Sequence, residues 1–234
     1  MLTYLQKTTF DLLHFFYPHP CAGCGEPLSS KDQSICADCY IDLPETHFQH
    51  SADNPVERLF HGRLKLRAAM ASYFFSKKQA LRHIIHSFKY EQNKEACIQM
   101  GKWMGAHLKS SERMRPVDFL IPIPIHPSRE KKRGYNQAQL LGEGIEHATG
   151  IPMLRDIVQR IRATETQTRK GRSERWKNVE AGFYVEDESL LQHKHLLLID
   201  DVITTGATFE ACGSVILKAQ PASLSIAALA WASE

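Results

Sequence analysis

Two adjacent aspartates in the stretch LLLIDDVITTGAT, residues 196–208, have the type and spacing to bind a sugar. Four apolar residues precede Asp200 and Asp201, as expected of a strand that is covered on both faces of a parallel sheet. Open α/β sheets bind ligands at the carboxyl ends of their strands, which is where we expect the pair to stand. Because carboxylates accept hydrogen bonds from vicinal hydroxyl groups, a sugar diol is a natural partner for both.

The turn after the aspartates contains the donors that a phosphate needs. It supplies backbone N–H groups and three hydroxyls, and its residues are Thr204, Thr205, Gly206, Ala207 and Thr208. Gly206 permits a positive φ and a close approach of the backbone to a ligand. We expect a helix to begin directly after the turn, so that its positive end points to the same place. A 5-phosphorylated ribose would satisfy the carboxylates and the turn together.

Other uses of an acidic pair remain open at this level. Asp200 and Asp201 can cap and solvate the following helix without binding any ligand. A paired-aspartate strand end also occurs in receiver domains, which are phosphorylated on aspartate. A Walker loop is excluded, because no G-K-[ST] follows the glycine. The apolar run before the pair and the T-T-G-x-T turn after it favour the ribose phosphate.

Four of the six cysteines form two C-x-x-C pairs that are separated by eleven residues. In a reducing compartment this arrangement indicates metal binding rather than a disulfide. Two such pairs match a tetrahedral Cys₄ zinc site, which is structural because it leaves no open position for catalysis. Simple burial of unpaired cysteines is the alternative. The predicted zinc ligands are Cys21, Cys24, Cys36 and Cys39.

Two basic segments have the composition to meet an anion. The first, HPSREKKRG at residues 126–134, follows a short apolar run and contains four Lys or Arg against one acid. The second, residues 155–178, contains eight Lys or Arg and three acids, and its polar, basic part would suit a lid over an anionic ligand. A solvated turn is the alternative for the first, and a disordered surface loop for the second. Basic groups around Trp176 would also suit single-stranded nucleic acid.

These motifs carry a resemblance to a known family. The stretch LLLIDDVITTGAT resembles the phosphoribosyl pyrophosphate (PRPP) motif of type I phosphoribosyltransferases. IPIPIHPSREKKRGYNQAQLL and the N-terminal four-cysteine module are similar to the ComF/GntX group within that superfamily, and TETQTRKGRSERWKNVEAGF resembles its long mobile loop. The resemblance extends from about Cys21 to Trp231. It implies that Asp200 and Asp201 hold the ribose 2- and 3-hydroxyls, and that residues 204–208 hold the 5-phosphate.

The resemblance further implies a Mg²⁺-dependent transfer from PRPP, in which pyrophosphate leaves C1 through an oxocarbenium-like state. The residues expected at the pyrophosphate are Ile125, His126, Arg129 and Arg133 and, from the lid, Arg169 and Lys170. The family name implies support of DNA uptake in natural competence, and nucleotide metabolism is the related role. The alternative is a non-catalytic module that senses a nucleotide and binds single-stranded DNA or a helicase partner.

The elements that must position these residues alternate between strand and helix patterns, which predicts an α/β fold with a mostly parallel sheet flanked by helices. The resemblance implies the type I phosphoribosyltransferase fold for residues 51–234, after a helix and a zinc-ribbon-like module at residues 1–50. Residues 46–55 are polar and turn-rich, which indicates a linker. We expect strands at residues 66–75, 117–125, 154–161, 181–185, 195–199 and 223–232, and helices at 77–90, 95–108, 135–149 and 207–220.

The composition of the chain limits the other possibilities. With 234 residues, 43% of them hydrophobic, and a net charge of +3, it has the balance of an ordinary globular protein and is too weakly basic to imply nucleic acid. No apolar run approaches the roughly 20 residues of a membrane-spanning helix, so we expect no membrane insertion and a cytoplasmic location. Only three residues follow Trp231, so we expect any base specificity to come from the region before Val117 or from a partner.

Overall fold

The structure of the protein is a computed structural model that describes residues 19–30, 33–75, 80–160 and 182–232. The predicted helix at residues 5–16 and the predicted lid residues Arg169, Lys170 and Trp176 lie outside the described residues. Among the residues that are described, no helix combines the length and the hydrophobicity that a membrane crossing requires.

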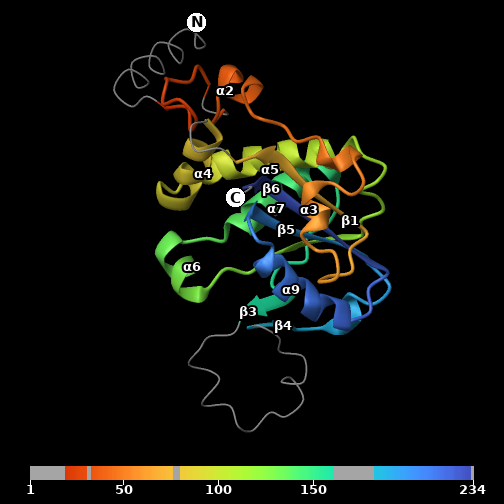
Figure 1. Cartoon of the computed structure of the whole chain (residues 1–234). Coiled ribbons are helices and arrows are strands. Elements are labelled where there is room, and N and C mark those ends of the chain that lie inside the picture. Colours follow the sequence, from red (N-terminus) through yellow and green to blue (C-terminus); the bar gives the residue numbers. More distant parts are fainter. Residues whose placement is uncertain (1–18, 31–32, 76–79, 161–181, 233–234) are drawn as a thin grey trace, which may run out of the picture.

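A four-stranded parallel sheet forms the centre of the molecule (Figure 1). Its strands lie in the order β1, β6, β5, β2, and every neighbouring pair is parallel. A separate pair, β3 and β4, is antiparallel. In the described part of the chain, the six strands all overlap stretches that the sequence pattern predicts as strands, so the α/β class with a mostly parallel sheet is confirmed. Their bounds are β1 Ala68–Phe74, β2 Phe119–Pro122, β3 Val158–Arg160, β4 Phe183–Val185, β5 His195–Ile203 and β6 Ser223–Trp231.

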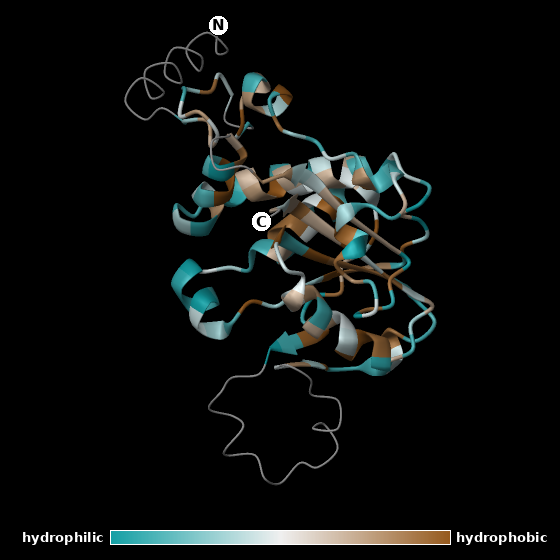
Figure 2. Cartoon of the chain, in the orientation of Figure 1, coloured by the Kyte–Doolittle hydropathy of each residue, from teal (hydrophilic) through white to brown (hydrophobic). Residues whose placement is uncertain are grey.

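Helices cover the sheet and leave its hydrophobic residues in the interior (Figure 2). Helices α5 and α7 pack on each other, and α7 also packs on β2 and β5. Helix α9 packs on β4, β5 and β6. The longer helices are α4 Ala80–Tyr90, α5 Lys94–Lys109, α6 Pro127–Arg133, α7 Gln137–Thr149 and α9 Ala207–Lys218. The short ones are α2 Ala37–Ile41, η1 Phe48–His50, α3 Pro55–Arg58 and η3 Glu188–Leu190.

Two glycines allow α5 and α7 to approach each other closely. A Cβ atom on Gly101 would lie 2.2 Å from the carbonyl oxygen of Leu141, and one on Gly144 would lie 2.2 Å from that of Ile98. Neither distance is sterically possible, so the helices can meet at this separation only because both side chains are absent. The contact fixes the layer on which the N-terminal cysteine segment rests.

The segment at residues 46–55 is packed against the domain, and its prediction as a linker is wrong. The hydroxyl of Thr46 donates to Ala71 O, and Phe48 is buried. The buried amide of Asn54 donates to Ala69 O at 2.8 Å and to Phe48 O at 3.2 Å. Thr46 and Asn54 therefore satisfy backbone groups of β1 and attach this segment to the sheet. The division of the chain at residue 50 stays a prediction.

Two element boundaries near the aspartates also differ from expectation. Strand β5 continues to Ile203, so the aspartates lie inside the strand and not after its end. The basic segment at residues 126–134, expected to meet an anion and with a solvated turn as the alternative, forms the helix α6. It begins at Pro127 behind the capping side chain of His126, and it ends at Gly134, whose φ is 83°. Proline at the first helical position and glycine just past the last one are the local signals for such a helix.

Candidate functional site

A polar cavity with a volume of about 130 Å³ opens at the carboxyl end of the sheet. It forms there because β2 pairs with β5 only as far as Pro122 and Ile199, whereas β5 continues alongside β6 to Ile203. The last residues of β5 are thereby free of a neighbour on one side. The cavity is lined by Lys89, Ile123, Pro124, Ile125, His126, Arg129, Arg133, Asn136, Gln137, Arg160, Asp200, Asp201 and Thr208.

The structure brings most of the predicted site residues together in this cavity. Asp200, Asp201 and Thr208 from the C-terminal half line it. The predicted residues of the β2–α6 segment line it as well, and these are Ile125, His126, Arg129 and Arg133.

The rest of the predicted turn, residues 204–207, does not line this cavity. Gly206 is the N-cap of α9 with a φ of 75°, which confirms the predicted positive φ. A Cβ atom there would lie 2.9 Å from the ring of Phe60, so glycine is required sterically as well as conformationally. Thr204, Thr205 and Ala207 are exposed, and Thr205 O accepts a hydrogen bond from Arg63 Nη1 at 3.0 Å. The turn therefore stands beside the cavity, open to solvent.

The two carboxylates belong to opposite faces of β5, because successive side chains of a strand alternate. Asp201 is on the face toward α4 and forms an ion pair with Lys89. The backbone N–H of Asp201 donates to Asp200 Oδ1 at 2.8 Å. Burial, reinforced by the neighbouring Asp201, raises the pKa of Asp200 to about 7, although that N–H, Lys89 and Arg160 oppose the shift. The site thus holds one carboxylate in an ion pair, Asp201, and one whose pKa is raised, Asp200.

Two cations of the cavity were missed by sequence reasoning. Lys89 lies in the last turn of α4, and Arg160 is the last residue of β3. Lys89 belongs to no motif, and the sequence pattern predicts only an amphipathic helix around it. Arg160 lies in a predicted strand and is one of the eight cations of the basic segment at residues 155–178, but nothing singles it out within that segment. No local signal identifies them, because they reach the aspartates through the tertiary fold.

The segment Tyr135–Gln137 ties the cavity to the end of α4. The Tyr135 hydroxyl donates to Phe88 O, the residue before Lys89, and Gln137 Nε2 donates to the same oxygen at 3.4 Å. Asn136, which is buried, caps α7 and donates to Ile123 O at 2.9 Å. These hydrogen bonds set the position of Lys89 relative to Ile123, the residue that follows β2.

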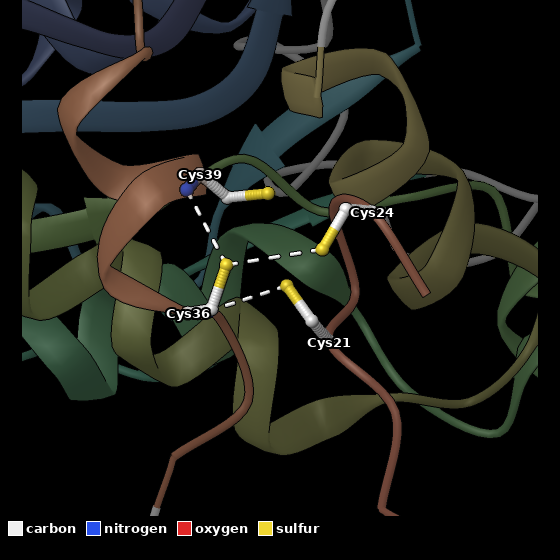
Figure 3. Close-up of side chains that lie close together, drawn as sticks. All are labelled: Cys21, Cys24, Cys36 and Cys39. Atoms are coloured by element: carbon white, nitrogen blue, oxygen red, sulfur yellow. Dashed lines mark hydrogen bonds between the residues drawn. The ribbon is translucent and has the colours of Figure 1, made fainter. Parts of the chain in front are cut away.

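The four cysteines of the N-terminal module converge on one point (Figure 3). Their sulfur atoms all lie within 4.8 Å of one another, and Cys24 Sγ is 3.8 Å from Cys36 Sγ. Burial would raise the pKa of the Cys21 thiol, but backbone N–H groups, among them those of Cys36 and Gly23, outweigh burial and lower it to about 6. Burial raises the pKa of Cys39, so the thiols differ in how readily they lose a proton. The convergence of the four sulfur atoms is what is consistent with a metal site.

The cysteine module rests on α4 and α5. The backbone N–H of Ser34 donates to Gln99 Oε1 at 3.0 Å, and His83 Nδ1 lies 2.9 Å from Gly23 O. The rings of Tyr40 and Trp103 lie 4.4 Å apart between centroids. Helix α4 therefore touches the cysteine module near its start and reaches the cavity with Lys89 near its end.

The chain is similar in sequence to proteins of competence and DNA utilization. No protein-family model matches the chain. It is 32% identical to competence protein F of Haemophilus influenzae over 111 residues, which is 47% of this chain and only about half, 48%, of that protein. It is 27% identical to competence protein ComFC of Bacillus subtilis, covering 88% of this chain and 75% of that one. It is 24% identical to the DNA utilization protein YhgH of Escherichia coli K12, covering 85% and 84%.

Solved structures give weaker likenesses. Glutamine PRPP amidotransferase from B. subtilis has a TM-score of 0.41 at 16% identity, covering 57% of this chain and 26% of that one. UMP synthase of Leishmania donovani has a TM-score of 0.35 at 14% identity, covering 73% and 29%. At these TM-scores the likenesses support no inference about function. The sequence similarities, together with the α/β fold and the four-cysteine cluster, make the chain a homologue of the competence protein F, ComFC and YhgH proteins.

Proposed function

We propose that the cavity at the end of β5 binds PRPP, or a related ribose 5-phosphate, with Mg²⁺, and that the protein is a phosphoribosyltransferase. The observation that carries this proposal is the meeting, in one cavity, of Asp200 and Asp201 with cations from three other segments. A diol flanked by phosphates needs this combination of acceptors and positive charge. A receiver domain would not require the cations of α6.

Each part of the ligand has a partner in this arrangement. The carboxylates of Asp200 and Asp201 accept hydrogen bonds from the ribose hydroxyls. The exposed turn at residues 204–208 and the positive end of α9 receive the 5-phosphate. Arg129 and Arg133 face the pyrophosphate. When the ribose hydroxyls bind Asp201, Lys89 is released from its ion pair. Its positive charge then adds to the charges of Arg129 and Arg133.

The proposed reaction breaks the bond between C1 and the pyrophosphate oxygen, and a lone pair of the acceptor forms the new bond at C1. The cations of the cavity stabilise the charge that develops on the leaving pyrophosphate. Mg²⁺, held mainly by substrate oxygens, neutralises part of the same charge when it is bound. Closure of a lid that carries Arg169 and Lys170 stays a prediction.

For the cysteine cluster we propose a structural Zn²⁺. Four thiolates at the usual Zn–S distance of about 2.3 Å form a tetrahedron with edges of about 3.8 Å. The separation of Cys24 Sγ from Cys36 Sγ is 3.8 Å, and no pair in the cluster exceeds 4.8 Å, so the residues fit the ion. All four positions are taken by protein, which suits a structural role.

The names of the relatives connect the proposed activity to DNA. One relative is a competence protein F and others are DNA utilization proteins, so we propose a role in the uptake or use of DNA, or in nucleotide metabolism. A second candidate is a non-catalytic sensor that binds single-stranded DNA or a helicase. It is favoured by the exposed cations of α6, Lys131 and Lys132.

Calorimetry with PRPP and Mg²⁺ tests the proposal directly. We expect the wild type to bind PRPP and Asp200→Ala/Asp201→Ala to lose at least 100-fold in affinity, because two charge-assisted hydrogen-bonding groups are removed. The control is Glu112→Ala, because the side chain of Glu112 is 91% exposed and lines neither cavity of the site. No binding by the wild type would refute the donor site. DNA binding that persists in the double variant, without any pyrophosphate release, would favour the sensor.

A further inference from the structure

A second cavity, with a volume of about 410 Å³, adjoins the one that holds the aspartates. It lies between the end of α4 and the helix α6, which face each other at this side of the molecule (Figure 1). Its lining residues are Lys89, Tyr90, Gln92, Arg129, Lys132 and Arg133. Lys89, Arg129 and Arg133 line both cavities, so the two are contiguous.

Tyr90 is the unusual member of this lining. Tyr90 is a large hydrophobic residue, and yet 63% of its surface is exposed. The ring is held in place by His86, at 4.7 Å between centroids, and by the guanidinium of Arg133, at 5.9 Å from the ring centre. An aromatic ring fixed at the mouth of a polar cavity is suited to stack on a planar ligand.

The charge of this cavity is strongly positive. Four of its six lining residues are Lys or Arg. Within the described part of the chain, neither Arg129 nor Lys132 has a recorded ion pair or hydrogen bond from its side chain. The nearby Glu91 is engaged by His86 at 3.1 Å, and Lys89 is paired with Asp201 in the first cavity. The remaining acid of α6 is Glu130, which is exposed and lines neither cavity.

We propose that this second cavity is the acceptor subsite, and that it takes an aromatic ring joined to a phosphate, which is the chemistry of a nucleotide. The ring stacks on Tyr90, and the phosphate meets Lys132, the lining cation that does not also line the first cavity. Pyrophosphate or a simple amine would make no use of the exposed ring, and an uncharged base would make no use of the cations. The inference rests on the proposed donor site, because an acceptor requires a donor in the adjoining cavity.

The test measures the two cavities separately in the full-length protein. Thymidine 5′-monophosphate is titrated by calorimetry into the wild type, Tyr90→Ala and Tyr90→Phe, and PRPP with Mg²⁺ is titrated into the same proteins. We expect Tyr90→Ala to lose about 5- to 100-fold in affinity for the nucleotide, Tyr90→Phe to retain it, and PRPP binding to stay within twofold in both. Tyr40 is an exposed tyrosine on α2 that is 41% accessible. The variant Tyr40→Ala is therefore the matched control and should change neither the nucleotide affinity nor the PRPP affinity.

A short oligothymidylate in parallel distinguishes a free nucleotide from the end of a strand. Tighter, Tyr90-dependent binding of the oligomer would assign the subsite to a strand, and equal or tighter binding of the monophosphate would assign it to a free nucleotide. If PRPP binds but neither thymidine ligand does, the acceptor inference fails and the donor site stands. If the thymidine ligands bind and PRPP does not, the proposed function and the acceptor role both fail. Loss of nucleotide binding equally in Tyr40→Ala and Tyr90→Ala would also overturn the subsite.

Discussion

The cysteine cluster and the carboxylate cavity are assembled in opposite ways. The cluster takes all four sulfur atoms from residues 21–39, a single short segment. The cavity takes its charged groups from α4, the β2–α6 segment, β3 and β5, which are distant in the chain. A local site can be recognised by spacing, whereas an assembled site depends on which strands become neighbours.

The two regions are nevertheless joined by one helix. A Cβ atom on Gly23 would lie 2.6 Å from Cys39 Sγ and 3.3 Å from the Cβ atom of Ala80, the first residue of α4. At the other end of α4, Lys89 pairs with Asp201. Changes in each region therefore show whether the sites are independent or coupled through this helix.

The largest effect is expected from Cys39→Ser. Metal binding to structural Cys-rich sites is worth about 10–16 kcal/mol in small peptides, so loss of one ligand should release the ion and unfold the module. Metal analysis should find zinc in the wild type and little in the variant, and hydrogen exchange should rise at residues 19–44. Cys97→Ala, a buried cysteine outside the cluster, should keep the metal. Loss of PRPP binding together with the metal would show that α4 couples the two sites.

Asn136→Ala is expected to destabilise the cavity side by about 2–3 kcal/mol. The change leaves the N–H of Ala138 and the buried Ile123 O without the partner that the amide provides. Urea denaturation measures the loss. Asn93→Ala is the matched control, because that side chain also caps a helix but bonds only to Ala96 N, at 3.0 Å, and should cost about 1 kcal/mol. Equal losses would mean that the link to β2 contributes nothing.

Gly206→Ala should cost about 2 kcal/mol in the free energy of unfolding. It places a side chain at a φ of 75° and against the Phe60 ring. Gly150→Ala has nearly the same φ, 76°, with no atom within 4 Å of the new Cβ, and should cost only about 1 kcal/mol. Thermal unfolding of the two variants isolates the Phe60 contact. A smaller shift for Gly206→Ala than for Gly150→Ala would contradict this contact.

The smallest effect is expected for Asp200→Asn, which is also the only variant that we expect to be more stable than the wild type. Because burial raises the pKa of Asp200 from 3.8 to about 7, the folded state binds more protons than the unfolded state between those values. The wild type therefore loses stability as the pH rises from about 4 to about 7. Asparagine removes this loss, so the variant should be more stable than the wild type by about 1 kcal/mol at pH 8, with a smaller difference at pH 4. Urea denaturation at both pH values measures it, and a less stable variant at pH 8 would mean that the ionised Asp200 is compensated by Lys89 and Arg160.

These predictions contrast a cluster whose metal stabilises its own segment with a cavity in which the burial of the Asp200 carboxylate costs stability. Asp200, a buried carboxylate with a raised pKa, and Arg129, which has no side-chain ion pair or hydrogen bond within the described residues, are features of a site that binds a ligand. If Asp200→Asn were neutral and Cys39→Ser harmless, the contrast between the two regions would disappear.

The sequence by itself determined the parts of this protein that depend on neighbours in the chain. Apolar runs and 3.6-residue spacing located the strands and the main helices, and C-x-x-C spacing located the sulfur cluster. T-T-G-x-T predicted the positive φ at Gly206. Each of these is a property of a short stretch, because local backbone sterics and side-chain alternation decide it.

Only the tertiary structure decided what surrounds the aspartates. The strand order β1, β6, β5, β2 and the early end of β2 leave one side of β5 open, and this opening receives Lys89 and Arg160. The same packing places the ring of Tyr90 beside the guanidinium of Arg133, where no motif marks it. The reason is physical: contacts between distant segments are set by how the layers pack around a shared core, and the core pattern is compatible with many surface residues at these positions.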